Sequence, residues 1–173
     1  MTTFMQKLKP RLEALPLGAT LKNHDVMLAT WFGAGRVRPA PGTIGTLAAL
    51  PFGYAISYFT TPVGLTIAAA LLLWLGTKAS DSYVARSGKK DDQTIVVDEV
   101  VGVWIAAIPA ATHWQLWLAA FVLFRIFDIY KPFPATIFEK KENGKGIDVM
   151  MDDVVAGIYA FFGVAALALV ITP

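Results

Sequence analysis

The sequence predicts an all-α protein, a compact multihelical bundle that is partly membrane-embedded, with short helical hairpins and a C-terminal hydrophobic helix. Hydrophobic residues make up 55% of the chain and charged residues 16%, against about 45–50% and about 25% in soluble domains. The mean hydropathy is +0.54. Lys, Arg, Asp and Glu are absent from three windows, residues 47–76, 100–124 and 154–172. This distribution points towards contact with lipid.

The length of 173 residues suits one domain, since domains commonly contain about 100–200 residues. Residues 1–25 are interpreted as a polar, amphipathic N-terminal segment without the apolar region of a signal peptide, and residues 26–173 as a single helical domain. The chain has no cysteine, which excludes disulfides, zinc–thiolate sites and thiol nucleophiles. A net charge of only +2, without a basic block, argues against nucleic acid as a partner.

The first two uncharged windows each predict a helical hairpin. Residues 47–76 are interrupted at Thr60-Thr61-Pro62, and residues 100–124 are interrupted around Pro109 and residues 112–115. Proline and short polar runs interrupt helices. Arms of about 12–14 residues extend only roughly 18–21 Å as helix, so we expect them to be partial, re-entrant or buried rather than spanning.

The last window is the best candidate for a membrane span. Residues 154–172 are nineteen residues without a charge, close to the roughly 20 that cross about 30 Å of hydrocarbon. In the hairpin arrangement the neutral turns lie on one side and every cationic loop on the other, which predicts that the cationic side is cytoplasmic. The alternative is a soluble bundle with a very apolar core, because windows this short also fit buried helices.

Carboxylates gather at the ends of these windows. Six of the thirteen lie at or near the window mouths, and these are Asp98, Glu99, Asp128, Asp148, Asp152 and Asp153. A carboxylate beside hydrocarbon is unfavourable unless it is paired, hydrogen-bonded or bound to a cation. Mg²⁺ prefers oxygen ligands such as carboxylates, water and phosphate oxygens, so the sequence favours a magnesium site. For each acidic pair alone, helix N-capping is the alternative.

A shared magnesium site requires the chain to form the predicted hairpins. They return the Asp98-Glu99 pair and the Arg125–Asp128 segment to one face, where Asp152-Asp153 is expected to open the final helix. The three clusters can then share a site, whereas one straight helix through the second window would separate the first two clusters across the membrane. The first and third clusters also begin similar stretches, Asp-Glu-Val-Val-Gly and Asp-Asp-Val-Val-Ala-Gly.

Cationic side chains beside these carboxylates could bind a phosphate. Arg125 and Asp128 are three residues apart and share a helix face, and Lys131 precedes Pro132, where the helix is expected to end. Arg can hold two phosphate oxygens as a fork and Lys one as a point charge, although Arg125 and Asp128 could equally be a plain ion pair. The Pro41–Thr46 turn offers free amides and threonine hydroxyls to an anion, its alternative being a turn with a threonine N-cap.

Four ordered blocks resemble the phosphatidylglycerophosphatase A family. They are PAPGTIGTLAALP (Pro39–Pro51), VDEVVGVW (Val97–Trp104), FRIFDIYKPFP (Phe124–Pro134) and MDDVVAG (Met151–Gly157), and the resemblance covers about residues 26–165. It implies a multihelical, Mg²⁺-dependent phosphatase that converts phosphatidylglycerophosphate to phosphatidylglycerol in phospholipid biosynthesis. It also implies a location in the bacterial inner membrane, where the loop charges predict an active site facing the cytoplasm.

The resemblance also assigns roles to residues. Metal ligands are Asp98, Glu99, Asp152 and Asp153; catalytic residues are Asp98, Glu99, Asp128 and Asp153; and substrate-binding residues are Thr43, Arg125 and Lys131. The expected partners are the lipid substrate and the bilayer. The Gly144–Asp148 stretch departs from the shorter glycine-rich approach expected in the family, so Asp148 is left out of the ligands. The alternative function is a non-enzymatic membrane protein, a divalent-cation conduit or scaffold with acidic helix mouths.

Overall fold

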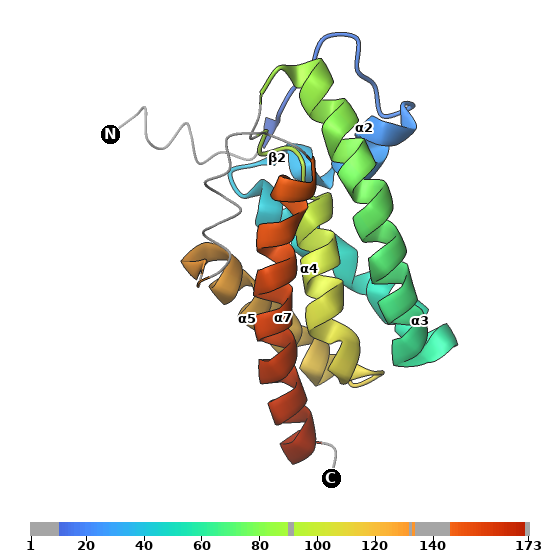
Figure 1. Ribbon diagram of the computed structural model, residues 1–173, viewed down its shortest axis with the longest axis vertical. Helices are drawn as coiled ribbons and strands as arrows, with labels where there is room; N and C mark the ends of the chain where they lie inside the picture. Colours follow the sequence, from blue (N-terminus) through green and yellow to red (C-terminus); the bar gives the residue numbers. More distant parts are fainter. Residues whose placement is uncertain (1–10, 90–91, 132, 134–145, 172–173) are drawn as a thin grey trace.

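The computed structural model describes residues 11–89, 92–131, 133 and 146–171. Most of these residues are helical (Figure 1). The α-helices are α2 (His24–Ala29), α3 (Pro41–Ser87), α4 (Val97–Ala107), α5 (Trp114–Tyr130) and α7 (Gly146–Ile171), with 3₁₀ turns η1 (Ala34–Arg36) and η2 (Ile108–Ala110). A short ladder joins β1 (Arg11–Leu12) antiparallel to β2 (Val37–Arg38). The all-α class is therefore confirmed.

α3 consists of two arms that reverse direction at the predicted break. Thr61 has φ 72° and ψ 172°, outside the helical region, and Pro62 follows it. A proline disfavours helical dihedrals in the residue before it, so the break is a local property of the sequence. Figure 1 shows the chain descending through the first arm and returning through the second. The helix begins at Pro41, before the uncharged window, and continues past it through residues 77–87. Both arms are therefore longer than the short arms expected from the sequence, because charged and polar residues outside the window also adopt the helix.

α4 and α5 form the second predicted hairpin. η2 and a short turn separate them, and the turn residue Ala111 has φ 46°. The Ala111 carbonyl oxygen accepts hydrogen bonds from Ser57 Oγ at 3.0 Å and from Trp117 Nε1 at 2.9 Å. Side chains of α3 and α5 thus fix the turn that joins α4 to α5.

The end of α5 and the start of α7 decide where the polar clusters lie. α5 stops before Lys131, the C-cap with φ 46°, as the proline that follows predicts. α7 begins at Gly146, whose N–H donates to Asp81 Oδ1 at 2.5 Å. The expectation that Asp152-Asp153 opens this helix is therefore wrong. The pair lies inside α7 and cannot cap it, because a carboxylate from α3 satisfies the true first turn.

α4 is the buried centre of the bundle. It packs against α3, α5 and α7, and its fully buried residues are Val97, Val100, Val101, Val103, Ala106 and Ala107. Trp104 Nε1 donates to the Ala49 carbonyl oxygen of α3 at 3.0 Å, which satisfies the one donor of the indole. α7 runs beside α4 with its N-terminus at the same end (Figure 1). The acidic start of α4 is therefore set on the most tightly packed helix.

Two helices, α3 and α7, are long and apolar enough to cross a membrane. Only 22% and 28% of their most apolar stretches are buried inside the protein, so neither resembles the core helix of a soluble bundle. Large apolar side chains are exposed at the break of α3, as with Phe59, and at the end of α7, as with Leu169. Apolar surface of this extent marks contact with lipid or with another protein, which favours membrane association over a soluble bundle.

Candidate active site

A cavity of about 420 Å³ opens at the end of the bundle where α3, α4 and α7 begin and α5 ends. All residues assigned to the site from the sequence line it, and these are Thr43, Asp98, Glu99, Arg125, Asp128, Lys131, Asp152 and Asp153. The three clusters therefore converge as the hairpin arrangement requires. Asp148, which was left out of the ligands, is not among the lining residues.

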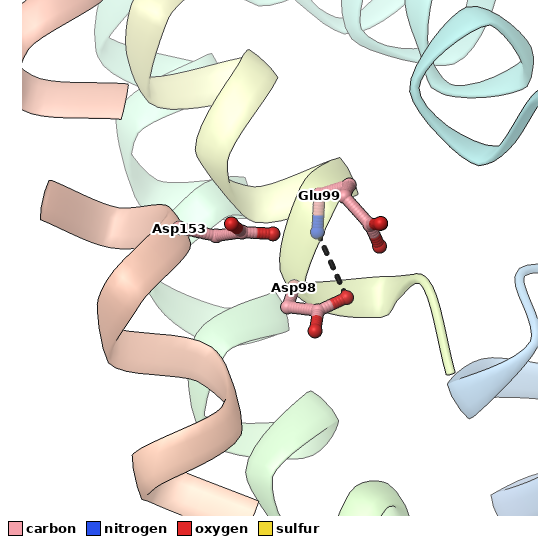
Figure 2. Close-up of side chains that lie close together, drawn as sticks. All are labelled: Asp98, Glu99 and Asp153. Atoms are coloured by element: carbon pink, nitrogen blue, oxygen red, sulfur yellow. Dashed lines mark hydrogen bonds between the residues drawn. The ribbon is translucent and has the colours of Figure 1, made fainter. Parts of the chain in front are cut away.

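Asp98, Glu99 and Asp153 lie together in this cavity, and we call them the carboxylate cluster. Asp98 and Glu99 belong to the first turn of α4, and Asp153 projects from α7 towards them (Figure 2). One carboxylate oxygen of each lies within 4.8 Å of the others. Asp98 Oδ1 accepts a hydrogen bond from the Glu99 backbone N–H at 3.0 Å. Bonding to a first-turn amide suits the capping alternative, but capping does not account for the approach of Asp153.

Burial makes the ionised form of these carboxyls unfavourable. Burial raises the pKa of Asp98 well above its usual value, and the negative charge of Glu99 adds to this effect. Burial also raises the pKa of Glu99, to about 8, and the charge of Arg125 offsets only part of the rise. Glu99 Oε2 is buried without a hydrogen-bond partner. Such a group is stable only when a proton or a cation binds it.

Two cationic side chains border the carboxylate cluster. Arg125 Nη1 lies 2.5 Å from Asp128 Oδ2 and 4.0 Å from Glu99 Oε1, so the ion pair expected on α5 is present. Arg125 Nε is nevertheless buried without a hydrogen-bond partner, which leaves a donor for a ligand. Lys131 Nζ donates to Asp152 Oδ2 at 3.0 Å. Asp152 is therefore engaged by Lys131 and stands outside the carboxylate cluster.

The start of α3 forms another wall of the cavity. The helix begins at Pro41, so Thr43 lies within the first turn and is not the N-cap. First-turn N–H groups have no acceptor within their own helix and can bind an anion. A Cβ on Gly42 would overlap the Glu99 carboxylate and lie 3.2 Å from Arg125 Nη1. A larger residue at position 42 would therefore displace the Glu99 carboxylate from its present place in the cavity.

Two further lining residues, Asp92 and Gln93, have no distinguishing signal in the sequence, because they lie in a polar stretch outside the apolar windows. Asp92 Oδ1 accepts hydrogen bonds from Thr94 N and Oγ1 at 3.1 and 2.8 Å, which shapes the turn into α4. Gln93 Oε1 accepts from Arg38 Nη1 at 2.6 Å. Because arginine only donates, the Gln93 amide nitrogen is the end left to donate towards a ligand.

The chain matches the family model described as phosphatidylglycerophosphatase A over residues 27–168. A phosphatidylglycerophosphatase A of Haemophilus influenzae is 46% identical over 151 residues, which cover 86% of this chain and 91% of that protein. The Escherichia coli protein of the same name is 36% identical over 139 residues, 80% of each chain. A Bacteroides thetaiotaomicron protein, provisionally named a phosphatidylinositol-3-phosphatase, is 40% identical over 152 residues, 81% of this chain and 91% of that protein. No solved structure matches significantly.

The family match extends across α3, α4, α5 and most of α7, the four helices that build the cavity. Relatives this similar over most of their length set aside the alternatives of a cation conduit and a scaffold. The chain therefore belongs to the phosphatidylglycerophosphatase A family and is a phosphatase.

Proposed function

We propose that this protein hydrolyses the terminal phosphomonoester of phosphatidylglycerophosphate, in phospholipid biosynthesis, in a reaction that depends on Mg²⁺. The names of the two relatives from Haemophilus influenzae and Escherichia coli support the substrate. One structural observation supports the proposed metal-dependent hydrolysis. Three carboxylates from α4 and α7 meet in a single cavity beside Arg125 and Lys131.

The carboxylate cluster fits Mg²⁺ in its donor set and in its electrostatics. All three groups offer oxygen atoms, the ligands that Mg²⁺ prefers, and Glu99 Oε2 is buried without any other partner. Bound there, Mg²⁺ would neutralise phosphate charge and lower the pKa of a water ligand. Asp98, Glu99 and Asp153 would hold it, and Asp152 as a further ligand stays a prediction, since Lys131 engages it.

The neighbouring residues fit the binding of a phosphate. Arg125 has an unused Nε donor at the cavity, and arginine binds two oxygens of a phosphate as a fork. Lys131 lies on the same side and adds a second positive charge. The first-turn amides of α3, with the Thr43 hydroxyl, would bind a further oxygen. Together these groups would orient the phosphorus for attack and stabilise the charge that develops on its oxygens.

Asp128 lies where it can take part in the proton transfer of this reaction. Hydrolysis forms a bond between the water oxygen and phosphorus and breaks the bond between phosphorus and the glycerol oxygen, which must gain a proton. Asp128 lines the cavity and is held by Arg125 at 2.5 Å. It would orient the attacking water or return a proton to the leaving alcohol.

A membrane location suits this substrate. The lipid keeps its acyl chains in the bilayer, and α3 and α7 are long and apolar enough to cross it. The cavity lies at the end of the bundle that carries the charged residues of 77–89, 92–99 and 125–131. We therefore propose the bacterial inner membrane as the location, with the active site at its cytoplasmic edge.

Phosphate release from phosphatidylglycerophosphate in mixed micelles tests the proposal. The full chain should be active with Mg²⁺, lose activity in EDTA and regain it when Mg²⁺ is restored. Asp153→Asn should lower kcat by about 100-fold or more, since it removes a ligand from the cluster. Asp148→Asn is the matched control on the same helix, because Asp148 does not line the cavity, and it should keep its activity.

The outcomes separate the parts of the proposal. Unchanged turnover in EDTA would contradict the metal dependence. Absence of turnover with Mg²⁺ would contradict the substrate. Equal losses in Asp153→Asn and Asp148→Asn would contradict the assignment of the site.

A further inference from the structure

The outer face of α5 is an apolar stripe. Leu118, Val122, Ile126 and Ile129 follow one another at intervals of four, four and three residues, and their exposures range from 46% to 75%. Side chains at this spacing share one face of a helix. The opposite face of α5 packs into the core through Leu116, Trp117, Ala120 and Phe124. From Leu118 to Ile129, α5 therefore presents a row of large apolar groups that the described part of the chain leaves uncovered.

This stripe leads into the candidate active site. Ile129, at its upper end, lines the cavity and is 75% exposed. It lies four residues after Arg125, whose side chain is only 18% exposed and faces the carboxylates. Ile129 thus stands at the rim, with the polar cavity on one side and the stripe on the other. A ligand whose phosphate is held at Arg125 can therefore extend past Ile129 onto the stripe.

We propose that the stripe on α5 binds a hydrocarbon chain of the lipid substrate while the phosphate lies in the cavity. This inference rests on the proposed function and adds the route by which the lipid enters. From Leu118 to Ile129 the helix rises roughly 16 Å at 1.5 Å per residue, which matches one leaflet, half of about 30 Å of hydrocarbon. A chain lying along the stripe would therefore stay within its leaflet while the headgroup reached the carboxylate cluster.

Two surface variants of similar exposure test this assignment. Ile126 is 53% exposed on the stripe, and Ile67 is 57% exposed on α3 and does not line the cavity. Ile126→Ser and Ile67→Ser remove similar apolar groups, so they change general affinity for a membrane alike. Each is compared with the unmodified chain on dipalmitoyl phosphatidylglycerophosphate in mixed micelles and on the soluble dibutanoyl form.

Ile126→Ser should raise KM for the dipalmitoyl substrate on the order of fivefold, with kcat unchanged. The bound acyl chain would lose its apolar contact with the side chain of Ile126, and an apolar contact of this size accounts for a change of that order. The effect on the dibutanoyl substrate should be smaller, about twofold or less, because its four-carbon chains extend only a short way past Ile129 and reach residue 126 with their last atoms at most. Ile67→Ser should leave KM for both substrates as it is. Val122→Ser, one turn further along, should repeat the result of Ile126→Ser.

Several results would overturn the assignment. Equal KM values for Ile126→Ser and Ile67→Ser would show that the stripe contacts the membrane in general and does not bind the substrate. Equal effects of Ile126→Ser on the two substrates would show that Ile126 affects KM by stabilising the fold and not by contacting the acyl chain. Sedimentation in detergent that shows a dimer dissociated by Ile126→Ser would assign the stripe to a second copy of this chain. If the unmodified chain hydrolysed neither substrate, the proposed function itself would fail, which is a distinct result.

Discussion

Gly102 and Gly157 bring the backbones of α4 and α7 into direct contact. A Cβ on Gly157 would lie 2.5 Å from the Gly102 carbonyl oxygen, and a Cβ on Gly102 would lie 2.8 Å from the Asp153 carbonyl oxygen. Each glycine lies four residues after a carboxylate, Asp98 on α4 and Asp153 on α7. The crossing therefore lies one helical turn from the carboxylate cluster and sets the distance between its two halves.

Gly157→Ala should weaken both the fold and the site. The added methyl group overlaps backbone, which cannot rotate away, so the helices must separate. We expect a loss of about 1–3 kcal/mol in the free energy of unfolding and a higher Mg²⁺ concentration for half-maximal activity. Thermal unfolding and Mg²⁺ titration of activity measure these effects.

Gly163→Ala is the matched control for this variant. It lies on the same helix, but a Cβ there would meet chiefly Leu123 Cδ1, the end of a flexible side chain, at 2.9 Å. It should retain stability, helped by the better helix propensity of alanine. Equal behaviour of the two variants would show that the contact between α4 and α7 does not set the site.

The stability of the metal-free protein should fall as pH rises from about 5 to about 8. The pKa of Glu99 is raised from 4.5 to about 8, so within this range Glu99 is ionised in the unfolded chain and protonated in the folded chain. The folded state then binds more protons, and a rise in pH favours unfolding. The pKa of Asp98 is shifted in the same direction by burial. Thermal unfolding in EDTA across this range measures the slope.

Glu99→Gln should reduce this pH dependence, because residue 99 no longer titrates, while the raised pKa of Asp98 keeps part of the slope. Mg²⁺ should restore stability most strongly at the alkaline end, since metal binding requires ionised ligands. A metal-free protein that becomes more stable as pH rises through this range would contradict a protonated, buried Glu99.

Arg125→Lys should lower kcat/KM for the lipid by about 100-fold, although the charge is kept. Lysine cannot form the forked contact with two phosphate oxygens, and its donors all lie on one nitrogen atom, which cannot reach the phosphate and Asp128 in the geometry that arginine provides. The inhibition constant for inorganic phosphate should rise in parallel. Steady-state kinetics with both ligands measure these effects.

Arg86→Lys supplies the control for that substitution. Arg86 forms an ion pair with Asp25 at 2.9 Å and does not line the cavity, so its replacement should leave kcat/KM as it is. Full activity in Arg125→Lys would show that Arg125 serves only as the ion-pair partner of Asp128.

The sequence by itself determined where the helices break and which residues lie at the breaks. Thr61 before Pro62, the turn after Pro109 and Lys131 before the next proline are set by backbone chemistry within a few residues. Uncharged windows identified the apolar arms, because helices that face lipid exclude charge. These local features were sufficient to predict the hairpins and the convergence of the acidic segments.

Only the tertiary structure decided which carboxylates form a group and what holds them. The start of α7 depends on Asp81, a partner 65 residues away, so its position could not be inferred from the nearby sequence. Likewise Asp152 binds Lys131, whereas its neighbour Asp153 joins the carboxylate cluster. The two similar stretches Asp-Glu-Val-Val-Gly and Asp-Asp-Val-Val-Ala-Gly end in Gly102 and Gly157, at which α4 and α7 touch. The sequence shows the similarity but not this contact, because contact between distant segments depends on the whole fold.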